Sequence, residues 1–491
     1  MESVFATRPG TASRVTILTL AIYGAALAFL AVQSDLRRVA NQVIVASIVA
    51  GGAVIVLASL AKERVGSDRG HRDFRAPALL GLAFMARIAL LNPESGLSDD
   101  FYRYAWEGRV VLAGENPFVH SPNDPSLTAL RDDRIWPKIT HRDVPAAYPP
   151  LAQMVFAIAA LTPWPIGFLR VLFTGCEFSM LLIVMSLIAR PGGSRAMLVL
   201  AALAPLMLLE YAGSMHFDSL ALLGVAIAWH ARERGRSIAA VGLIALATLA
   251  KPFPLVLLPL FLERRVWRSQ IAIFLAVIVV AHLPFVRDGL PYRGLARYAE
   301  EWSFNAPLFP TVVALLRAFR DYAFDHGLTG VPWLSAPMRG LVESQPEFLA
   351  RIALGTVLLG VAIAQWWPRV HETRSWESRA LRVMLALLLC SPVVHPWYVT
   401  WLVPFAAVAH RDPLAKCAWL WVVLAPLGYH VLPEFIEYGI WREDRLWRAI
   451  QYAPVLLSIA WVGCFSSNSG SGPLGVSGAE RIGSKDANPA Q

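Results

Sequence analysis

The sequence predicts an all-α polytopic membrane protein. Of its 491 residues, 56% are hydrophobic and only 16% are charged, and the mean hydropathy is +0.50, which is too apolar for a soluble protein. Apolar runs recur with lengths near the roughly 20 residues that a bilayer-crossing helix needs, and we count about 14 of them. The runs lack the period-two alternation, in segments of about ten residues, that a transmembrane β-barrel would show.

The charge pattern fits this class and argues against nucleic-acid binding. The net charge is +9, but the basic residues cluster in short connectors between apolar runs, as they do in cytoplasmic loops of membrane proteins. The clusters are Arg64/Arg69/Arg72/Arg75, Arg190/Arg195, Arg232/Arg234/Arg236 and Arg264/Arg265/Arg268. The four cysteines lie in or beside apolar runs without metal-binding or redox spacing, so we interpret them as packing residues.

Residues 1–75 predict two spans followed by a basic loop. Apolar runs at about 15–33 and 42–61 follow a short polar start. The first run is long and lacks a small-residue cleavage site, so we interpret it as a retained span and not as a signal peptide. The loop 62–75 is rich in Arg, which places it in the cytoplasm and directs the next span, about 76–92, to the outer face.

The outer face then carries a long polar loop, residues 93–148. We expect Ser98 to cap a helix over residues 99–113, which Gly114 would end. The rest of the loop is rich in proline and predicts an ordered coil with one short helix. About 50 polar residues inserted between spans usually serve a function.

Two adjacent carboxylates, Asp99 and Asp100, open this loop. In the structural interpretation the two carboxylates stabilise the N-terminus of the helix by their negative charge. Asp99 then begins a ladder of i,i+4 ion pairs through Arg103 and Glu107. In the functional interpretation one of them is a general base that accepts a proton from an acceptor hydroxyl at the membrane surface. Asp100 lies off the ladder and is the freer of the two.

Further apolar runs complete the membrane part. They lie at about 166–189, 196–211, 217–231, 270–287, 348–367, 380–396, 399–410, 417–432 and 447–464. A shorter run at 149–162 predicts a half-span or an interfacial helix. A second outer loop, 288–347, contains an amphipathic stretch near 308–320, and the Gly-, Ser- and Ala-rich tail 466–491 is expected to be disordered.

The stretch 238–262 has two possible topologies. As a single span it would put the basic cluster 264–268 outside, against the charge rule. As a hairpin broken at Lys251-Pro252 it keeps that cluster inside and presents Lys251 to the outer side. Irregular backbone at membrane depth is tolerated where it lines a cavity, so we prefer the hairpin.

Lys251 and Arg170 are the cations best placed for a phosphate. A lone Lys after an apolar helix is often a snorkelling anchor, but one that faces the carboxylate side at a helix break suits a phosphate. Arg170, near the start of its span, could meet a lipid phosphate or a headgroup. The sequence contains no P-loop, dinucleotide fingerprint or zinc-ligand spacing, which makes nucleotide-driven chemistry in the cytoplasm a poor fit.

Two more outer positions carry ionisable or aromatic groups. Glu210, His216 and Asp218 flank an outer turn, and ionisable groups within a membrane are functional candidates. His216 and Asp218 are two residues apart and would not share a helix face. The stretch 395–398, which begins with His395, falls on the same face. Its alternative, structural interpretation is that it belongs to an interfacial aromatic belt.

Seven short motifs in chain order carry a family resemblance. They are Asp99-Asp100-Phe101-Tyr102-Arg103-Tyr104, Gly114-Glu115-Asn116-Pro117-Phe118, Tyr148-Pro149-Pro150-Leu151-Ala152-Gln153, Gly213-Ser214-Met215-His216-Phe217-Asp218, Leu249-Ala250-Lys251-Pro252, Trp302-Ser303-Phe304-Asn305 and His395-Pro396-Trp397-Tyr398. Over roughly residues 76–430 the chain resembles polyprenyl-phosphate-dependent membrane glycosyltransferases of the GT-C type, closest to bacterial α-mannosyltransferases. Phe118 stands where such enzymes commonly have Tyr, and Met215-His216 replaces a frequent Gly-His pair.

The resemblance implies a GT-C-like bundle of about 14 transmembrane helices. Residues 76–465 would form the catalytic domain, with the active site at the extracytoplasmic membrane edge, and residues 1–75 would add two spans of unexplained role. Asp100 matches the catalytic Asp of such enzymes, with Asp99 adjacent. The substrate-binding residues would be Arg103, Tyr104, Tyr148, Gln153, Arg170, His216, Asp218, Lys251, Trp302, Asn305, His395, Trp397 and Tyr398.

We therefore expect an integral-membrane glycosyltransferase of the bacterial inner membrane. It would transfer a hexose, by resemblance mannose, from a polyprenyl-phosphate sugar to a glycolipid or cell-envelope glycan acceptor on the face toward the periplasm or cell exterior. Asp100 would be the base, and Lys251, with Arg103 or Arg170, would stabilise the leaving phosphate. His216, Asp218 and His395 would position the sugars or line the cavity.

No cofactor is required by this scheme, although a divalent metal, Mg or Mn, could sit at the Asp pair. Membrane lipids are expected partners and nucleic acids are not. The rival from another class is a multispan transporter or a lipid or glycan flippase. It predicts internal repeats with paired broken helices, whereas the sequence has one broken hairpin and no evident duplication.

Overall fold

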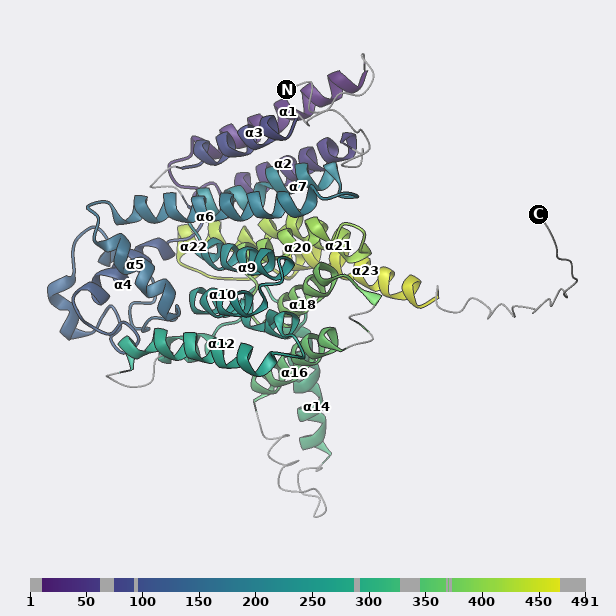
Figure 1. Ribbon diagram of the computed structural model, residues 1–491. Helices are drawn as coiled ribbons and strands as arrows, with labels where there is room; N and C mark the ends of the chain where they lie inside the picture. The colour runs from purple at the N-terminus through teal and green to yellow at the C-terminus, as the bar shows by residue number, and fades with distance from the viewer. Residues whose placement is uncertain are drawn as a thin grey trace, which may run out of the picture.

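The computed structural model describes residues 11–61, 75–91, 96–286, 292–326, 345–367, 370 and 373–468, and every regular element in these ranges is a helix (Figure 1). The only β-type pairing within them is an isolated bridge between Phe304 and Val393. The predicted all-α class is therefore confirmed. Most of the predicted basic loop 62–75, part of the outer loop 288–347 and most of the tail 466–491 lie outside the described residues.

Within the described ranges, seven helices are long and apolar enough to cross a membrane. They are Arg14–Ala31, Ala40–Leu60, Pro165–Ile188, Arg195–Gly213, Trp267–Phe285, Pro346–Trp366 and Pro413–Tyr438. Shorter apolar helices lie at Ala76–Ala89, Pro150–Ala160, Ser237–Ala250 and Pro396–Val408. The protein is thus a multi-pass helical bundle, and the figure of about 14 spans stays a prediction.

Three N-terminal helices form one edge of the bundle (Figure 1). They are α1 (Thr11–Ala31), α2 (Ala40–Leu60) and α3 (Arg75–Ala89), and they pack on α7 (Arg195–Leu203). A buried ion pair ties this edge to α6 (Pro165–Ile188): Arg87 Nε lies 2.5 Å from Glu177 Oε2. Arg87 also donates to the carbonyls of Ala83 and Ala202, so the pair links three helices.

The first outer loop folds into a compact unit at one end of the bundle, where Figure 1 shows α4 (Asp100–Leu112) beside α5 (Pro150–Ala160). The two helices approach closely because Gly108 has no side chain; a Cβ there would lie 2.1 Å from the carbonyl oxygen of Phe156. Helix α4 ends as predicted, with Gly114 at φ +80°. At 11 residues, α5 is too short to span, which agrees with the predicted half-span.

The predicted hairpin over residues 238–262 is confirmed. Helix α10 (Ser237–Ala250) is followed by a bend and by the short helices η5 (Phe253–Leu257) and α11 (Leu258–Phe261). The chain returns to where it began, because the side-chain amide of Gln270 donates to the carbonyls of both Ser237 and Phe261 at 3.2 Å. The hairpin therefore carries Lys251 at its bend.

The remaining elements complete the bundle. They are η2 (Pro125–Leu130), η3 (Trp136–Lys138), α8 (Pro205–Met207), η4 (Leu208–Gly213), α9 (Asp218–Glu233), α12 (Trp267–His282), η6 (Leu283–Phe285), α13 (Arg293–Glu301), α14 (Phe309–Asp325), α16 (Pro346–Trp366), α18 (Trp376–Cys390), α19 (Pro396–Val399), η8 (Thr400–Leu402), α20 (Val403–Val408), α21 (Pro413–Leu424), η9 (Ala425–Val431), α22 (Leu432–Tyr438) and α23 (Arg445–Asn468). The amphipathic stretch predicted near 308–320 corresponds to α14.

Basic connectors gather at the end of the bundle away from α4. Arg190 pairs with Glu233 at 2.8 Å, and Arg411 donates to the carbonyl of Gly192. Helix α6 has 24 residues and separates Arg190 from the α5 end by about 36 Å at 1.5 Å per residue. Arg190 and Arg411 therefore lie at the opposite end of the bundle from α5, and the membrane face of each end stays a prediction.

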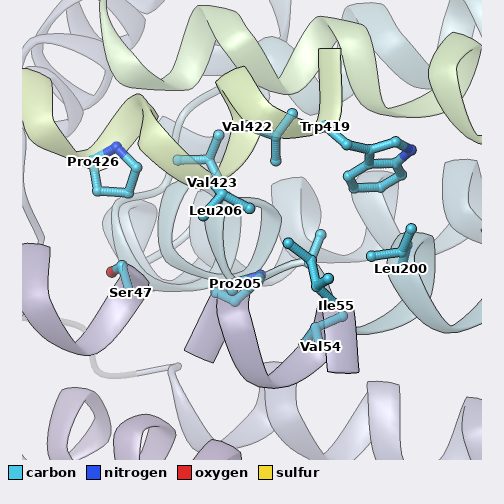
Figure 2. A pocket seen from close by; sticks show the side chains of 12 residues that line it. Ser47, Val54, Ile55, Leu200, Pro205, Leu206, Trp419, Val422, Val423 and Pro426 are labelled. Carbon is cyan, nitrogen blue, oxygen red and sulfur yellow. The ribbon is translucent and has the colours of Figure 1, made fainter. Parts of the chain in front are cut away.

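An apolar cleft lies between α2, α7–α8 and the α21–η9 segment (Figure 2). Figure 2 shows Val54, Leu206 and Val422 pointing into it, and no charged residue lines it. None of the predicted site residues borders the cleft, so we interpret it as a feature of helix packing.

Candidate active site

The two adjacent carboxylates at the start of α4 point to different surroundings. Asp100 is the first residue of the helix and Asp99 is its N-cap residue, so the predicted Ser98 cap over a helix from Asp99 is wrong by one residue. Ser98 Oγ instead accepts a hydrogen bond from the backbone N–H of Asp100 at 3.2 Å. Tyr104 lies one turn further along the same face of α4. Its ring stacks on Phe156 at 4.8 Å and meets Phe217 edge-on at 5.4 Å, which directs this face of α4 toward the start of α9.

Asp100 is the freer carboxylate, as the sequence indicated. Its side chain forms no hydrogen bond or ion pair with any residue that the structure describes. It lies close enough to Lys251, Tyr148 and Tyr298 to interact with them electrostatically. The Asp100 carboxylate therefore faces the groups that the sequence assigned to the site and remains open to a substrate hydroxyl.

Asp99 takes a different partner from the one predicted. The first rung of the expected ladder, between Asp99 and Arg103, gives way to an ion pair in which Arg37 Nη1 lies 3.7 Å from Asp99 Oδ2. The second rung forms, with Arg103 Nε 2.7 Å from Glu107 Oε1. Burial, together with the charge of Asp100, raises the pKa of Asp99 to about 6, while Arg37 opposes this rise.

Arg103 and Gln153 shape the wall of the site. The Arg103 guanidinium also donates to the carbonyls of His141 and Val144, which fixes the outer loop against α4. Gln153 Nε2 donates to Glu107 Oε2 at 2.6 Å. The structure therefore gives both residues partners inside the protein.

The turn that precedes α9 is irregular. The chain enters it through η4, a π-helical turn of the kind often found at functional sites. Arg170 Nη1 donates to the carbonyls of Ala212 and Gly213 at 2.7 Å, so its charge holds the end of this turn. Met215 has φ +61°, in the left-handed region that favours glycine, which fits the Gly that similar enzymes often carry here.

His216 is oriented by a buried carboxylate. Its Nδ1 lies 3.1 Å from Glu210 Oε2, and Tyr429 donates its hydroxyl to both carboxylate oxygens of Glu210 at 2.8 Å. The imidazole stacks on Trp397 with ring centroids 3.9 Å apart. Three segments distant in sequence therefore fix the plane of the His216 ring.

Asp218 and Lys251 form a buried ion pair. Lys251 Nζ lies 2.6 Å from Asp218 Oδ1, the same oxygen that accepts a 2.9 Å hydrogen bond from Trp401 Nε1. The ammonium group also lies 4.3 Å from the ring centre of Tyr398. Lys251 is thus neither exposed nor a snorkelling anchor, and its charge is balanced by Asp218.

In the described part of the chain, the stretch 216–218 has two buried side-chain polar atoms without a hydrogen-bond partner. They are His216 Nε2 and Asp218 Oδ2, and their residues are 1% and 0% exposed. A buried polar atom without a partner is destabilising, and in a native site it often marks the place of a ligand or water. We interpret these atoms as the binding groups that the site offers to a polar substrate.

The 395–398 motif and the second outer loop close the site. His395 also stacks on Trp397, with ring centroids 4.1 Å apart, so the indole contacts two imidazoles. The Tyr398 hydroxyl lies 3.1 Å from that of Tyr298. The structure thus packs the Trp397 ring against both His216 and His395, and leaves the motif half-buried at the site and not in an exposed aromatic belt.

The motif 302–305 runs beside this segment. Phe304 exchanges two backbone hydrogen bonds with the chain at 392–394, and Asn305 Nδ2 donates to the carbonyl of Val394. Trp302 stacks on Tyr298 with ring centroids 5.5 Å apart. These residues lie behind the site, where they support Tyr298 and the 395–398 motif.

The structure adds residues that the predicted set lacks. They are Arg37, Glu210, Tyr298, Trp401 and Tyr429. Glu210 was weighed as part of the outer turn, and Tyr298 lies close to the Trp302 motif. Tyr429 and Arg37 carry no local signal, because each reaches the site from a distant segment.

A resident metal ion fits this chain poorly. In the described part of the chain no group of three His, Cys, Asp or Glu side chains is arranged to hold an ion. Asp99 is occupied by Arg37, which leaves the Asp pair with one free carboxylate.

Comparisons with known proteins match this chain to two families and to a curated relative. The family model "Alpha-(1->6)-mannopyranosyltransferase, N-terminal domain" matches residues 7–265, just over half of the chain, and that of glycosyltransferase family 87 matches residues 146–392. The chain is 25% identical over 423 residues to α-(1→6)-mannopyranosyltransferase A of Mycobacterium tuberculosis, an alignment that covers 79% of this chain and 77% of the relative.

No solved structure matches the chain. The two family models together cover residues 7–392, from the first helix to the segment just before the 395–398 motif. The chain therefore belongs to the GT-C-type family of bacterial mannosyltransferases in glycosyltransferase family 87.

Proposed function

We propose that this membrane glycosyltransferase transfers mannose from a polyprenyl-phosphate sugar to a lipid-linked or cell-envelope glycan. The name of the mycobacterial relative supports mannose as the sugar. The gathering of basic connectors at the end of the bundle away from α4 supports a site on the extracytoplasmic face of the inner membrane.

The observation that carries the proposal is the unpartnered carboxylate of Asp100 at the edge of a buried polar site. Asp100 accepts the proton of an acceptor hydroxyl as that oxygen bonds to C1 of the sugar. The bond between C1 and the phosphate oxygen breaks on the opposite face, and its electron pair leaves with the polyprenyl phosphate. The reaction inverts the configuration at C1.

Lys251 is the cation that we assign to the leaving phosphate. Arg103 and Arg170 donate to main-chain carbonyls, so we assign them the role of holding the outer loop and the turn before α9 in place. The Asp218 carboxylate balances the charge of Lys251 before the donor binds. As negative charge develops on the leaving oxygen, the Lys251 ammonium can share its donors between that oxygen and Asp218.

The test is transfer of radiolabelled mannose in membranes that contain the wild type, Asp100→Asn, Asp99→Asn or Asp133→Asn. Synthetic polyprenyl-phosphate mannose is the donor and a native lipid extract supplies the acceptor. Loss of the base should reduce transfer by Asp100→Asn between about a hundredfold and ten-thousandfold. Asp133→Asn is the matched control, because Asp133 belongs to a second Asp-Asp pair in the same loop and is exposed.

Label in a new glycolipid with the wild type and with Asp133→Asn, but not with Asp100→Asn, supports the base assignment. Equal labelling by all four proteins would return the Asp pair to a role in helix capping. A wild type that is folded and transfers no mannose overturns the donor assignment. Flux of labelled lipid across vesicles without transfer would favour the rival transporter.

A further inference from the structure

The connector between α1 and α2, residues 32–39, lies against the candidate site. Leu36 is 1% exposed and lies against Gly213, at the end of the irregular turn. The segment that leads to Asp99 is tied to the same turn, because the backbone N–H of Leu97 donates to Ser214 Oγ at 3.1 Å. The connector, the turn and the start of α4 therefore meet at one place.

Arg37 is held in a defined orientation on this connector. Its Nε and Nη2 lie 3.2 and 3.3 Å from the two carboxylate oxygens of Asp35, and its Nη1 reaches Asp99 Oδ2 at 3.7 Å. Its neighbour Arg38 is 78% exposed at the side chain and reaches only Asp35. One of two adjacent arginines is therefore directed to the carboxylate pair.

We propose that Arg37 is a positioning residue for catalysis, which keeps Asp99 ionised and turned to the connector so that Asp100 is left free to take the proton. The proposal rests on the proposed function, since it needs Asp100 as the base. It also gives the first two helices a role, because they carry the connector that completes the site.

The physical argument is that two adjacent carboxylates compete for one proton. Near each other and partly buried, each disfavours the ionised form of the other. Asp100 and burial raise the pKa of Asp99, and Arg37 lowers it. Arg37 on the connector faces Asp99, and Asp35 and Tyr102 in turn face Arg37. The titratable groups that face Asp100 come from α4, the outer loops, the hairpin bend and η9: Tyr104, Glu107, Tyr148, Tyr298, Lys251 and Tyr429.

Loss of Arg37 therefore changes the pH dependence in one direction. Without its charge, Asp99 holds a proton at higher pH, and the protonated carboxyl is no longer held at the connector and can donate to Asp100. A base that accepts this hydrogen bond is not free to take the proton of the substrate, so transfer activity should begin to fall at a higher pH than in the wild type. We expect the acidic limb of the pH–rate profile to move up by roughly one pH unit in Arg37→Ala.

The experiment measures mannose transfer from synthetic polyprenyl-phosphate mannose at several pH values for the wild type, Arg37→Ala, Arg37→Lys and Arg38→Ala. Arg38→Ala should keep the wild-type limb, and Arg37→Lys should restore most of the shift because it restores the charge. Asp99→Asn removes the competing group, so adding Arg37→Ala to it should cause no further shift. Thermal unfolding in detergent checks that each variant is folded.

The outcomes separate this inference from the proposed function. A wild type that transfers mannose, with an unchanged acidic limb in Arg37→Ala, overturns the role of Arg37 alone. Equal shifts in Arg37→Ala and Arg38→Ala would also overturn it, since they would reflect only the surface charge of the connector. A folded wild type without mannose transfer overturns the proposed function and this inference together.

Discussion

Two sets of buried charges in this protein differ in whether their hydrogen bonds are complete. In the α3–α6 pair, Arg87 and Glu177 use both carboxylate oxygens and three guanidinium nitrogens for partners inside the protein. In the site, Asp218 Oδ2 and His216 Nε2 are equally buried but have no partner. A closed network holds helices together, whereas an open one is poised for a ligand. Whether every polar atom has a hydrogen-bond partner therefore distinguishes a structural buried charge from a functional one better than burial does.

The largest expected effect tests the closed pair. Glu177→Gln leaves the Arg87 charge buried and uncompensated, which should destabilise the fold by about 3–5 kcal/mol. The specific transfer activity of the molecules that remain folded should stay at the wild-type level. Thermal unfolding in detergent measures the first quantity and mannose transfer per folded molecule the second.

A double variant sharpens this prediction. Replacing both members, as Arg87→Met with Glu177→Met, removes the uncompensated charge and should recover much of the lost stability. A Glu177→Gln protein that is as stable as the wild type but inactive would contradict the structural role of the Arg87–Glu177 pair, because it would show that the pair contributes to catalysis.

The next largest effect tests the orientation of His216. Glu210→Gln keeps the size of the side chain but removes the charge that faces His216 Nδ1 and accepts from Tyr429. Loss of a hydrogen bond to a charged group should reduce kcat roughly 10- to 100-fold. Steady-state transfer kinetics give kcat and KM separately for this comparison.

Tyr429→Phe provides the graded variant. It removes one donor to Glu210 but leaves the carboxylate beside His216, so its effect on kcat should be smaller than that of Glu210→Gln. Wild-type kcat in Glu210→Gln would show that stacking on Trp397 and the backbone carbonyl of Glu210, 3.1 Å from His216 Nδ1, are enough to fix the His216 ring.

The smallest effect tests the ion pair that contains Lys251. Trp401→Phe removes the hydrogen bond from the indole to Asp218 Oδ1 and should lower transfer roughly three- to tenfold. Trp419→Phe is the matched control: this indole N–H is also buried but has no hydrogen-bond partner, and it lines the apolar cleft away from the site. Equal losses in the two variants would indicate a general packing defect.

Local patterns in the sequence were enough for several features of the fold. Hydropathy predicted the helical membrane class, and the basic cluster at 264–268 predicted the hairpin with Lys251 at its bend, which Gln270 confirms. Both rest on signals that each segment carries by itself: length, hydropathy and charge. The order of the motifs was also enough to indicate the family.

The partners of individual charges depended on the tertiary structure. The i,i+4 rule predicted that Asp99 would meet Arg103, but a cation from a different helix pair, Arg37, lies at Asp99 instead. Lys251 was predicted to face a phosphate, and the fold first gives it Asp218 as a counter-ion. Sequence spacing describes neighbours on one helix and carries no information on which distant segment packs there.

By itself, the sequence determined the class of the protein and its family, since these follow from composition and from short motifs. Only the tertiary structure decided that Arg37 is the partner of Asp99 and which histidine nitrogen is open. The physical reason is distance along the chain. Glu210 and Tyr429 lie 219 residues apart, and only helix packing brings the hydroxyl to the carboxylate that orients His216.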